Sequence, residues 1–250
     1  MVFFLFFLGL LIGSFLNAVI FRLRAGESFA RGRSYCPKCR KNLAWYELVP
    51  ILSFFLQGAR CRGCKQRIDW QYPLVELATG LGFLLIGLVA GSQGLWKVIE
   101  GCLFFLFLLV LFVYDLRYGL IPDQVVLPAI ATAAVFFLTT HRSPLVIGYW
   151  LLGIMIGSGF FALQYYASRG RWVGDGDIRF GALMGAMLGW PGVLAGLFLS
   201  YIIGGAAASC LLLAGKKQFG QTLPMGTFLA LGTFLAWLWG DQIFRWYWPL

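Results

Sequence analysis

The sequence predicts an all-α polytopic membrane protein with about eight transmembrane helices and a cytoplasmic zinc-binding loop domain between helices 1 and 2. Of its 250 residues, 60% are hydrophobic and only 12% are charged. Apolar runs close to the roughly 20 residues that span a bilayer recur along the chain. Two Cys-x-x-Cys pairs lie in a polar, basic segment after the first run. These three observations together define the predicted fold class.

The first apolar run, Val2 to Ile20, has the length of a signal peptide but lacks a preceding basic region and a convincing cleavage site. We therefore expect a retained helix over 1–22, a zinc-binding loop domain over 23–71 and a transmembrane domain over 72–250. A turn at Trp190-Pro191-Gly192 separates helices 6 and 7. After the first helix, the predicted spans are 72–91, 97–115, 122–140, 145–167, 177–189, 191–213 and 222–240.

Charge placement predicts the orientation. Eleven of the twenty basic residues lie between Arg22 and Arg67, so the positive-inside rule puts this segment in the cytoplasm and the N-terminus outside. Anionic membrane lipid is a sufficient partner for this charge, and the net charge of +10 calls for no nucleic acid. The later basic residues in predicted cytoplasmic loops are Arg117, Arg169, Arg171, Lys216 and Lys217.

The two cysteine pairs, Cys36 with Cys39 and Cys61 with Cys64, predict a tetrahedral four-thiolate zinc site. Disulfides or free thiols are the alternatives, but a cytoplasmic loop is a reducing environment. Four thiolates leave no open coordination position, so the zinc should be structural. Between the pairs, the apolar segment around Trp45 and Tyr46 is too short to span a bilayer, and we expect it to lie at the membrane interface.

Asp115 and Asp177 lie at the ends of apolar runs, both on the predicted cytoplasmic side. Ionisable residues at membrane depth are costly and therefore functional candidates. A carboxylate pair can hydrolyse a peptide when one member takes a proton from water and the other donates one. The alternatives are helix-end residues paired with Arg117 and Arg179, or the ion site of a proton- or ion-coupled transporter. Asp123 is expected to cap the next helix, and Asp175 to lie in a loop.

In its motifs the chain resembles the type IV prepilin peptidases, membrane aspartic proteases of the Gly-x-Gly-Asp kind. The resemblance extends over nearly the whole sequence, and the motifs occur in the family's order. Those that carry it are Gly13-Ser14-Phe15-Leu16-Asn17, the two cysteine pairs, Tyr72-Pro73-Leu74-Val75-Glu76-Leu77, Asp115 with Ile121-Pro122-Asp123, Gly174-Asp175-Gly176-Asp177, and Leu223-Pro224-Met225-Gly226.

The resemblance implies a bacterial inner-membrane enzyme that uses Asp115 and Asp177 to cleave the basic leader from prepilins and pseudopilins at the cytoplasmic face. It also implies zinc ligation by the four cysteines and, as in many members, methylation of the new N-terminus with S-adenosylmethionine. For this second activity we expect a site in the cytoplasmic loop with Glu47 and Glu76 as candidates. A non-enzymatic assembly scaffold built on the zinc module is a third possibility.

Overall fold

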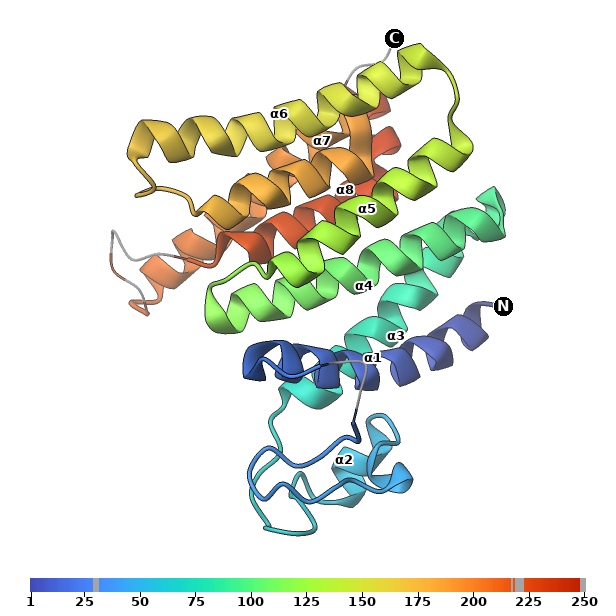
Figure 1. The fold of residues 1–250 in the computed structure, drawn as a ribbon, viewed down its shortest axis with the longest axis vertical. Coiled ribbons are helices and arrows are strands. Elements are labelled where there is room, and N and C mark those ends of the chain that lie inside the picture. The colour runs from blue at the N-terminus through green and yellow to red at the C-terminus, as the bar shows by residue number, and fades with distance from the viewer. Residues whose placement is uncertain (29–31, 217, 219–222, 248–250) are drawn as a thin grey trace. The chain divides into compact units, whose positions relative to one another are not determined.

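The computed structural model describes residues 1–28, 32–216, 218 and 223–247, with backbone only at 241 and 244–247. Lys217 and residue 222, the expected start of the last span, lie outside the described residues. The described chain is helical, and its only β pairing consists of two isolated bridges. The helices are α1 (Val2–Ala25), η1 (Trp45–Glu47), α2 (Leu52–Leu56), α3 (Gln71–Ala90), η2 (Gly91–Gln93), α4 (Leu95–Tyr118), α5 (Asp123–Thr140), α6 (Pro144–Ser168), α7 (Asp175–Leu213) and α8 (Met225–Tyr247) (Figure 1).

The chain divides into two compact units, 1–106 and 107–250, and α4 contributes to both. The predicted division into 1–22, 23–71 and 72–250 stays a prediction. Within the described residues, six helices are long and apolar enough to cross a membrane. They are α1, α3 with η2, α4, α5, α6 and α7, and α8 adds a shorter apolar stretch, Met225–Gly240. The multi-pass helical fold is therefore confirmed.

The first unit is built on the antiparallel pair α1 and α3. Glycine lets the two backbones touch: a Cβ at Gly9 would lie 2.6 Å from the Thr79 carbonyl oxygen, and one at Gly13 would lie 2.7 Å from the Glu76 Cα. Small residues four apart are the usual means of such close approach between membrane helices. Asn17 adds a polar contact, donating from Nδ2 to the Tyr72 carbonyl over 3.0 Å.

In the second unit, α7 packs against α5, α6 and α8. Its 39 residues are two helices joined across a break, where Gly189 has a φ of 62° and Trp190 is also non-helical. Figure 1 shows the part after the break running back alongside the part before it. The predicted spans 177–189 and 191–213 are thus both present. The turn begins at Gly189, one residue before the predicted one, because glycine tolerates the left-handed conformation.

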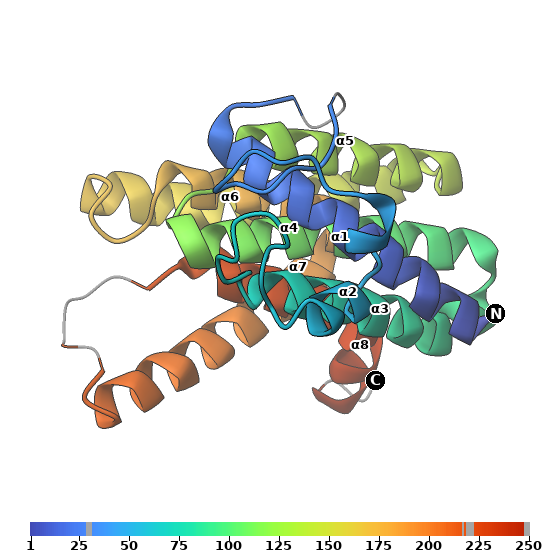
Figure 2. The same ribbon diagram turned by 90° about the horizontal axis from the view of Figure 1, so that it is seen from below.

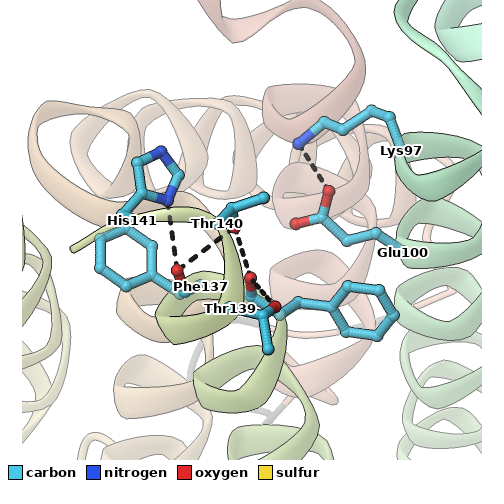
Figure 3. A network of polar contacts seen from close by, with 7 residues as sticks. Lys97, Glu100, Phe137, Thr139, Thr140 and His141 are labelled. Atoms are coloured by element: carbon cyan, nitrogen blue, oxygen red, sulfur yellow. Dashed lines mark hydrogen bonds and ion pairs between the residues drawn. The ribbon is translucent and has the colours of Figure 1, made fainter.

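The end of α5 holds the only histidine of the chain, His141. Its Nδ1 lies 3.2 Å from the Phe137 carbonyl oxygen, and the Thr139 and Thr140 hydroxyls also donate to the last carbonyls of the helix (Figure 3). An 18-residue helix is about 27 Å long. His141 is therefore far from Asp123 at the other end of α5. It cannot act as the acid or base in any reaction near Asp123.

Candidate functional site

Asp115 lies near the end of α4 and is 5% exposed. Its Oδ2 accepts hydrogen bonds from the Thr227 backbone N–H at 2.7 Å and from the Thr227 hydroxyl at 3.2 Å. The first turn of α8 can approach this closely because Gly226 has no side chain: a Cβ there would lie 3.0 Å from the Asp115 Cγ. The start of α8 thus holds one oxygen of the Asp115 carboxylate.

Asp177 lies in the first turn of α7 and is 7% exposed. Its Oδ2 accepts a hydrogen bond from the Gly174 N–H at 2.9 Å, an arrangement that caps the helix start. Gly176 packs against Ile121, where a Cβ would lie 3.0 Å from the Ile121 Cβ. The Gly-x-Gly-Asp segment therefore fixes the position of Asp177 against the start of α5.

The fold buries both predicted acids in the second unit, and the contact between Gly176 and Ile121 joins the segments that carry them. Arg179, an expected partner of Asp177, instead pairs with Asp123 and Asp175. Asp123 is the first residue within α5, and its side chain binds Arg179 without capping the helix, so the capping expectation was wrong. Asp175, expected in a loop, begins α7.

The four cysteines Cys36, Cys39, Cys61 and Cys64 converge, with all their sulfur atoms within 4.8 Å of one another. Two of the S···S distances are 3.9 and 4.0 Å. A tetrahedral ion with Zn–S bonds of about 2.3 Å has S···S edges of about 3.8 Å, so the cluster has the size of a four-thiolate site. None of the six cysteines forms a disulfide.

Each cysteine pair lies on the same kind of turn. The Arg40 N–H donates to the Cys36 carbonyl and the Lys65 N–H to the Cys61 carbonyl, both at 2.9 Å, and both donors have a positive φ. Hydrogen bonding by the Cys64 backbone N–H is the main cause that lowers the pKa of Cys61 to about 7. The turns aim backbone donors at the sulfurs, which favours the thiolates that bind metal.

Glu47 and Glu76, the expected methyl-transfer candidates, are both buried in the first unit. Glu76 Oε2 accepts a 2.7 Å hydrogen bond from the Ile51 N–H. Glu47 Oε2 accepts one from the Ala44 N–H at 2.9 Å, whereas its Oε1 is buried without a hydrogen-bond partner among the described residues and lies 3.7 Å from Lys41 Nζ. Glu47 Oε1 thus makes an ion pair but no hydrogen bond, whereas Glu76 binds the backbone of another segment.

Sequence reasoning missed three polar residues at these sites: Thr227 beside Asp115, and Ser14 and Asn17 on α1. Thr227 directly follows the Leu223-Pro224-Met225-Gly226 motif, and Ser14 and Asn17 lie inside Gly13-Ser14-Phe15-Leu16-Asn17. Both motifs were visible in the sequence. The sequence did not indicate which residues they contact. Thr227 is 112 positions from its partner Asp115, and Ser14 is 34 positions from its partner Leu48.

Comparisons with known proteins give a consistent picture. Residues 7–90 match the bacterial peptidase A24 N-terminal domain, and residues 102–209 match the type IV leader peptidase family. The chain is similar to proteins named prepilin leader peptidase/N-methyltransferase. One, from Bacillus subtilis, is 35% identical over 97% of this chain and 96% of its own length. Others are from Aeromonas salmonicida, at 32% over 97% and 92%, and from Pseudomonas aeruginosa, at 30% over 96% and 91%. No solved structure matches the chain significantly.

Proposed function

The chain belongs to the type IV leader peptidase family, and we propose that it removes the basic leader of type IV prepilins and pseudopilins at the cytoplasmic face of the inner membrane. We propose Asp115 and Asp177 as its catalytic residues. The observation that carries this assignment is the pair itself: two buried carboxylates in one unit, with Gly176 beside Asp177 packed against Ile121, six residues after Asp115. Burying a carboxylate costs free energy, so a buried acid in a membrane helix is a candidate for a function.

The hydrogen bonds suggest how the pair works. Thr227 donates two hydrogen bonds to Oδ2 of Asp115, so this oxygen acts as an acceptor in the structure. In this proposal Asp115 takes a proton from the attacking water while a protonated Asp177 donates to the scissile carbonyl. The Thr227 and Gly174 bonds engage Oδ2 of each aspartate, so we assign the proton transfers to the two Oδ1 atoms.

Matched substitutions test the assignment. Asp115→Asn and Asp177→Asn should each abolish leader cleavage of a purified prepilin. Asp123→Asn and Asp175→Asn are the controls, because these exposed acids lie near the pair but bind Arg179, and they should retain most activity. A similar melting temperature in detergent would show that the four variants fold. Full cleavage by either Asp115→Asn or Asp177→Asn would refute the assignment.

We also propose that the first unit methylates the new N-terminus with S-adenosylmethionine. Methyl transfer requires a neutral amine as nucleophile, and a buried carboxylate oxygen can accept the proton that the amine must lose. Glu47 Oε1 is such an atom and has no hydrogen bond in the described structure, so Glu47 is the stronger candidate for this role. Glu76 Oε2 already accepts a hydrogen bond from the Ile51 N–H.

Transfer of labelled methyl to a pre-cleaved pilin tests this second activity. Glu47→Gln should lower the rate of transfer and leave leader cleavage unchanged. Glu100→Gln is the control, because Glu100 is an α4 carboxylate paired with Lys97. Unchanged methylation in Glu47→Gln would exclude Glu47, and the absence of any transfer by the unmodified protein would exclude the activity for that substrate.

The proposed role of the four cysteines is structural. A zinc ion bound by all four thiolates would have no open position for substrate, so it would tie the two turns together without taking part in a reaction. Cys36→Ser should lower the bound zinc and loosen the loop while leaving the fold of the second unit intact. A zinc-depleted loop with unchanged resistance to proteolysis would contradict the structural role.

A further inference from the structure

The segment between the cysteine pairs, residues 45–56, packs against the sides of α1 and α3 and not against their ends. The Ser14 hydroxyl donates to the Leu48 carbonyl at 3.3 Å, and the Ile51 N–H donates to Glu76 at 2.7 Å. Figures 1 and 2 show the loop that carries α2 alongside the C-terminal half of α1. The segment therefore contacts α1 and α3 several residues inside the helix ends that connect to the loop.

Two measures give the depth. Ser14 precedes Asn17, which contacts Gln71 and Tyr72 at the start of α3, by three positions, or about 5 Å along α1 at a rise of about 1.5 Å per residue. Glu76 follows Gln71, the first residue of α3, by five positions, or about 7 Å. The 20 residues of α3 are about 30 Å long, which equals the thickness of the hydrocarbon core, so Gln71 marks its edge. The Leu48–Ile51 stretch thus lies about 5–7 Å inside the membrane boundary that Gln71 marks.

The side chains of this segment suit that depth. Of the five residues of α2, only Phe54 is buried, while Leu52, Phe55 and Leu56 are 56%, 60% and 72% exposed. A five-residue helix that presents three large apolar side chains outward would be costly in water. Trp70, 59% exposed, lies against Phe54 with ring centroids 5.0 Å apart and extends the same apolar surface.

The residues that flank this apolar surface indicate that lipid covers it. Four exposed basic residues follow α2 directly: Arg60, Arg62, Lys65 and Arg67. Basic residues beside an apolar, tryptophan-containing surface match the headgroup and acyl layers of an anionic bilayer. We propose that residues 45–56 form a re-entrant segment whose apolar side chains Leu52, Phe55 and Leu56 insert into the acyl layer of the membrane, clamped there by Glu76 and Ser14.

The contacts of Glu76 and Ser14 with the loop explain two structural features that have no part in the proposed catalysis. Ile51 has a φ of 61°, a conformation that costs free energy in a β-branched residue, and its N–H is the one that Glu76 binds. Glu76 is a buried carboxylate at membrane depth whose hydrogen bonds join α3 to the loop. Its role in this proposal is to position the loop, and it is not a catalytic residue.

Paired labelling of the full-length protein in vesicles of phosphatidylethanolamine and phosphatidylglycerol tests the proposal. A lipid-borne photoactivated carbene should label Leu52, Phe55 and Leu56 as strongly as the exposed α1 residues Phe7 and Leu11. Hydroxyl radicals from the water phase should spare them. Strong oxidation by hydroxyl radicals would overturn the proposal, and so would protection from both reagents, because a protein surface would then cover the segment.

Substitution of the clamp provides the second arm. Glu76→Ala should raise hydroxyl-radical oxidation of residues 52–56 several-fold and lower their carbene labelling, with zinc content and α1 labelling unchanged. Glu76→Gln, which retains an oxygen that can accept the Ile51 N–H, should stay near the unmodified protein. Glu100→Ala is a control at a carboxylate paired with Lys97. Identical labelling in Glu76→Ala and the unmodified protein would show that Glu76 does not hold the segment.

Discussion

The contact between Gly226 and Asp115 permits a sharp test of the proposed catalytic site. A Cβ at residue 226 would lie 3.0 Å from both Cγ and Oδ2 of Asp115 and 3.3 Å from its Cβ. These distances are tighter than ordinary van der Waals contact, and Asp115 is held in a buried position. Gly226→Ala should therefore push the first turn of α8 away from the carboxylate.

The expected loss of kcat follows from the hydrogen bonds that Gly226→Ala would break. The displaced turn carries the Thr227 N–H and hydroxyl, which both donate to Asp115 Oδ2. A hydrogen bond to a charged group contributes about 1.5–3 kcal/mol. At about 1.4 kcal/mol per tenfold change in rate, loss of this support should lower kcat for leader cleavage by about 10- to 100-fold. Thr227→Val removes only the 3.2 Å hydroxyl bond and should cost only a few-fold.

The assay is the initial rate of leader cleavage at saturating prepilin in detergent. Gly240→Ala is the matched control, because it adds the same methyl group to the same helix where, among the described residues, no atom outside the local helix backbone lies within 4 Å. Circular dichroism and melting temperature report on folding, and methylation of a pre-cleaved pilin reports on the other proposed activity. A wild-type kcat in Gly226→Ala, or an equal loss in Gly240→Ala, would refute the reasoning.

Three further predictions follow from the packing and the cysteine cluster. Gly185→Ala should lower the melting temperature through an overpacking cost of about 1–3 kcal/mol, since its Cβ would lie 2.3 Å from the Gly153 carbonyl oxygen. Gly205→Ala should not, because the described part of the chain places no atom outside the local helix backbone within 4 Å of its Cβ. Zinc affinity, measured by competition with a chelator, should fall as the pH drops through about 7, the pKa of Cys61, because half of this thiol is protonated there. A flat profile from pH 8 to about 6 would contradict this. Arg179→Gln should change stability by less than about 1 kcal/mol in thermal melts, because its ion pairs with exposed acids are screened by water.

The sequence predicted the helices well because hydrophobic length is a strong local signal. The span expected over 122–140 is α5 at Asp123–Thr140, and the span over 145–167 is α6 at Pro144–Ser168. The break between helices 6 and 7 was also visible, since Gly189 and Pro191 are both poor helix formers. Helix pairing was not predicted, because several glycine-rich stretches offered equivalent surfaces for close packing.

At the candidate site, the sequence indicated the acids but not their partners. Asp115 and Asp177 stood out because charges are rare in apolar runs. The pairing of Asp123 and Asp175 with Arg179 was misjudged, because helix-end acids have several possible partners and only the packed structure selects one. The hydrogen bonds from Thr227 depend on the approach of α8, which no local pattern indicates.

The buried carboxylates of the first unit show why composition alone cannot separate chemistry from architecture. From the sequence, Glu47 and Glu76 were both predicted as candidates for the methyl-transfer site. In the structure Glu76 Oε2 accepts the Ile51 N–H, so removing its carboxylate should first disturb the loop. Glu47 caps its own turn through Oε2 and keeps a buried, unbonded Oε1. Lys41 Nζ lies 3.7 Å from this oxygen, beyond hydrogen-bond distance, so the N–H of a bound amine would supply the donor that Oε1 lacks. The Oε1 without a hydrogen bond therefore favours Glu47 for chemistry, and the hydrogen bond from Ile51 favours Glu76 for holding the loop against the membrane helices.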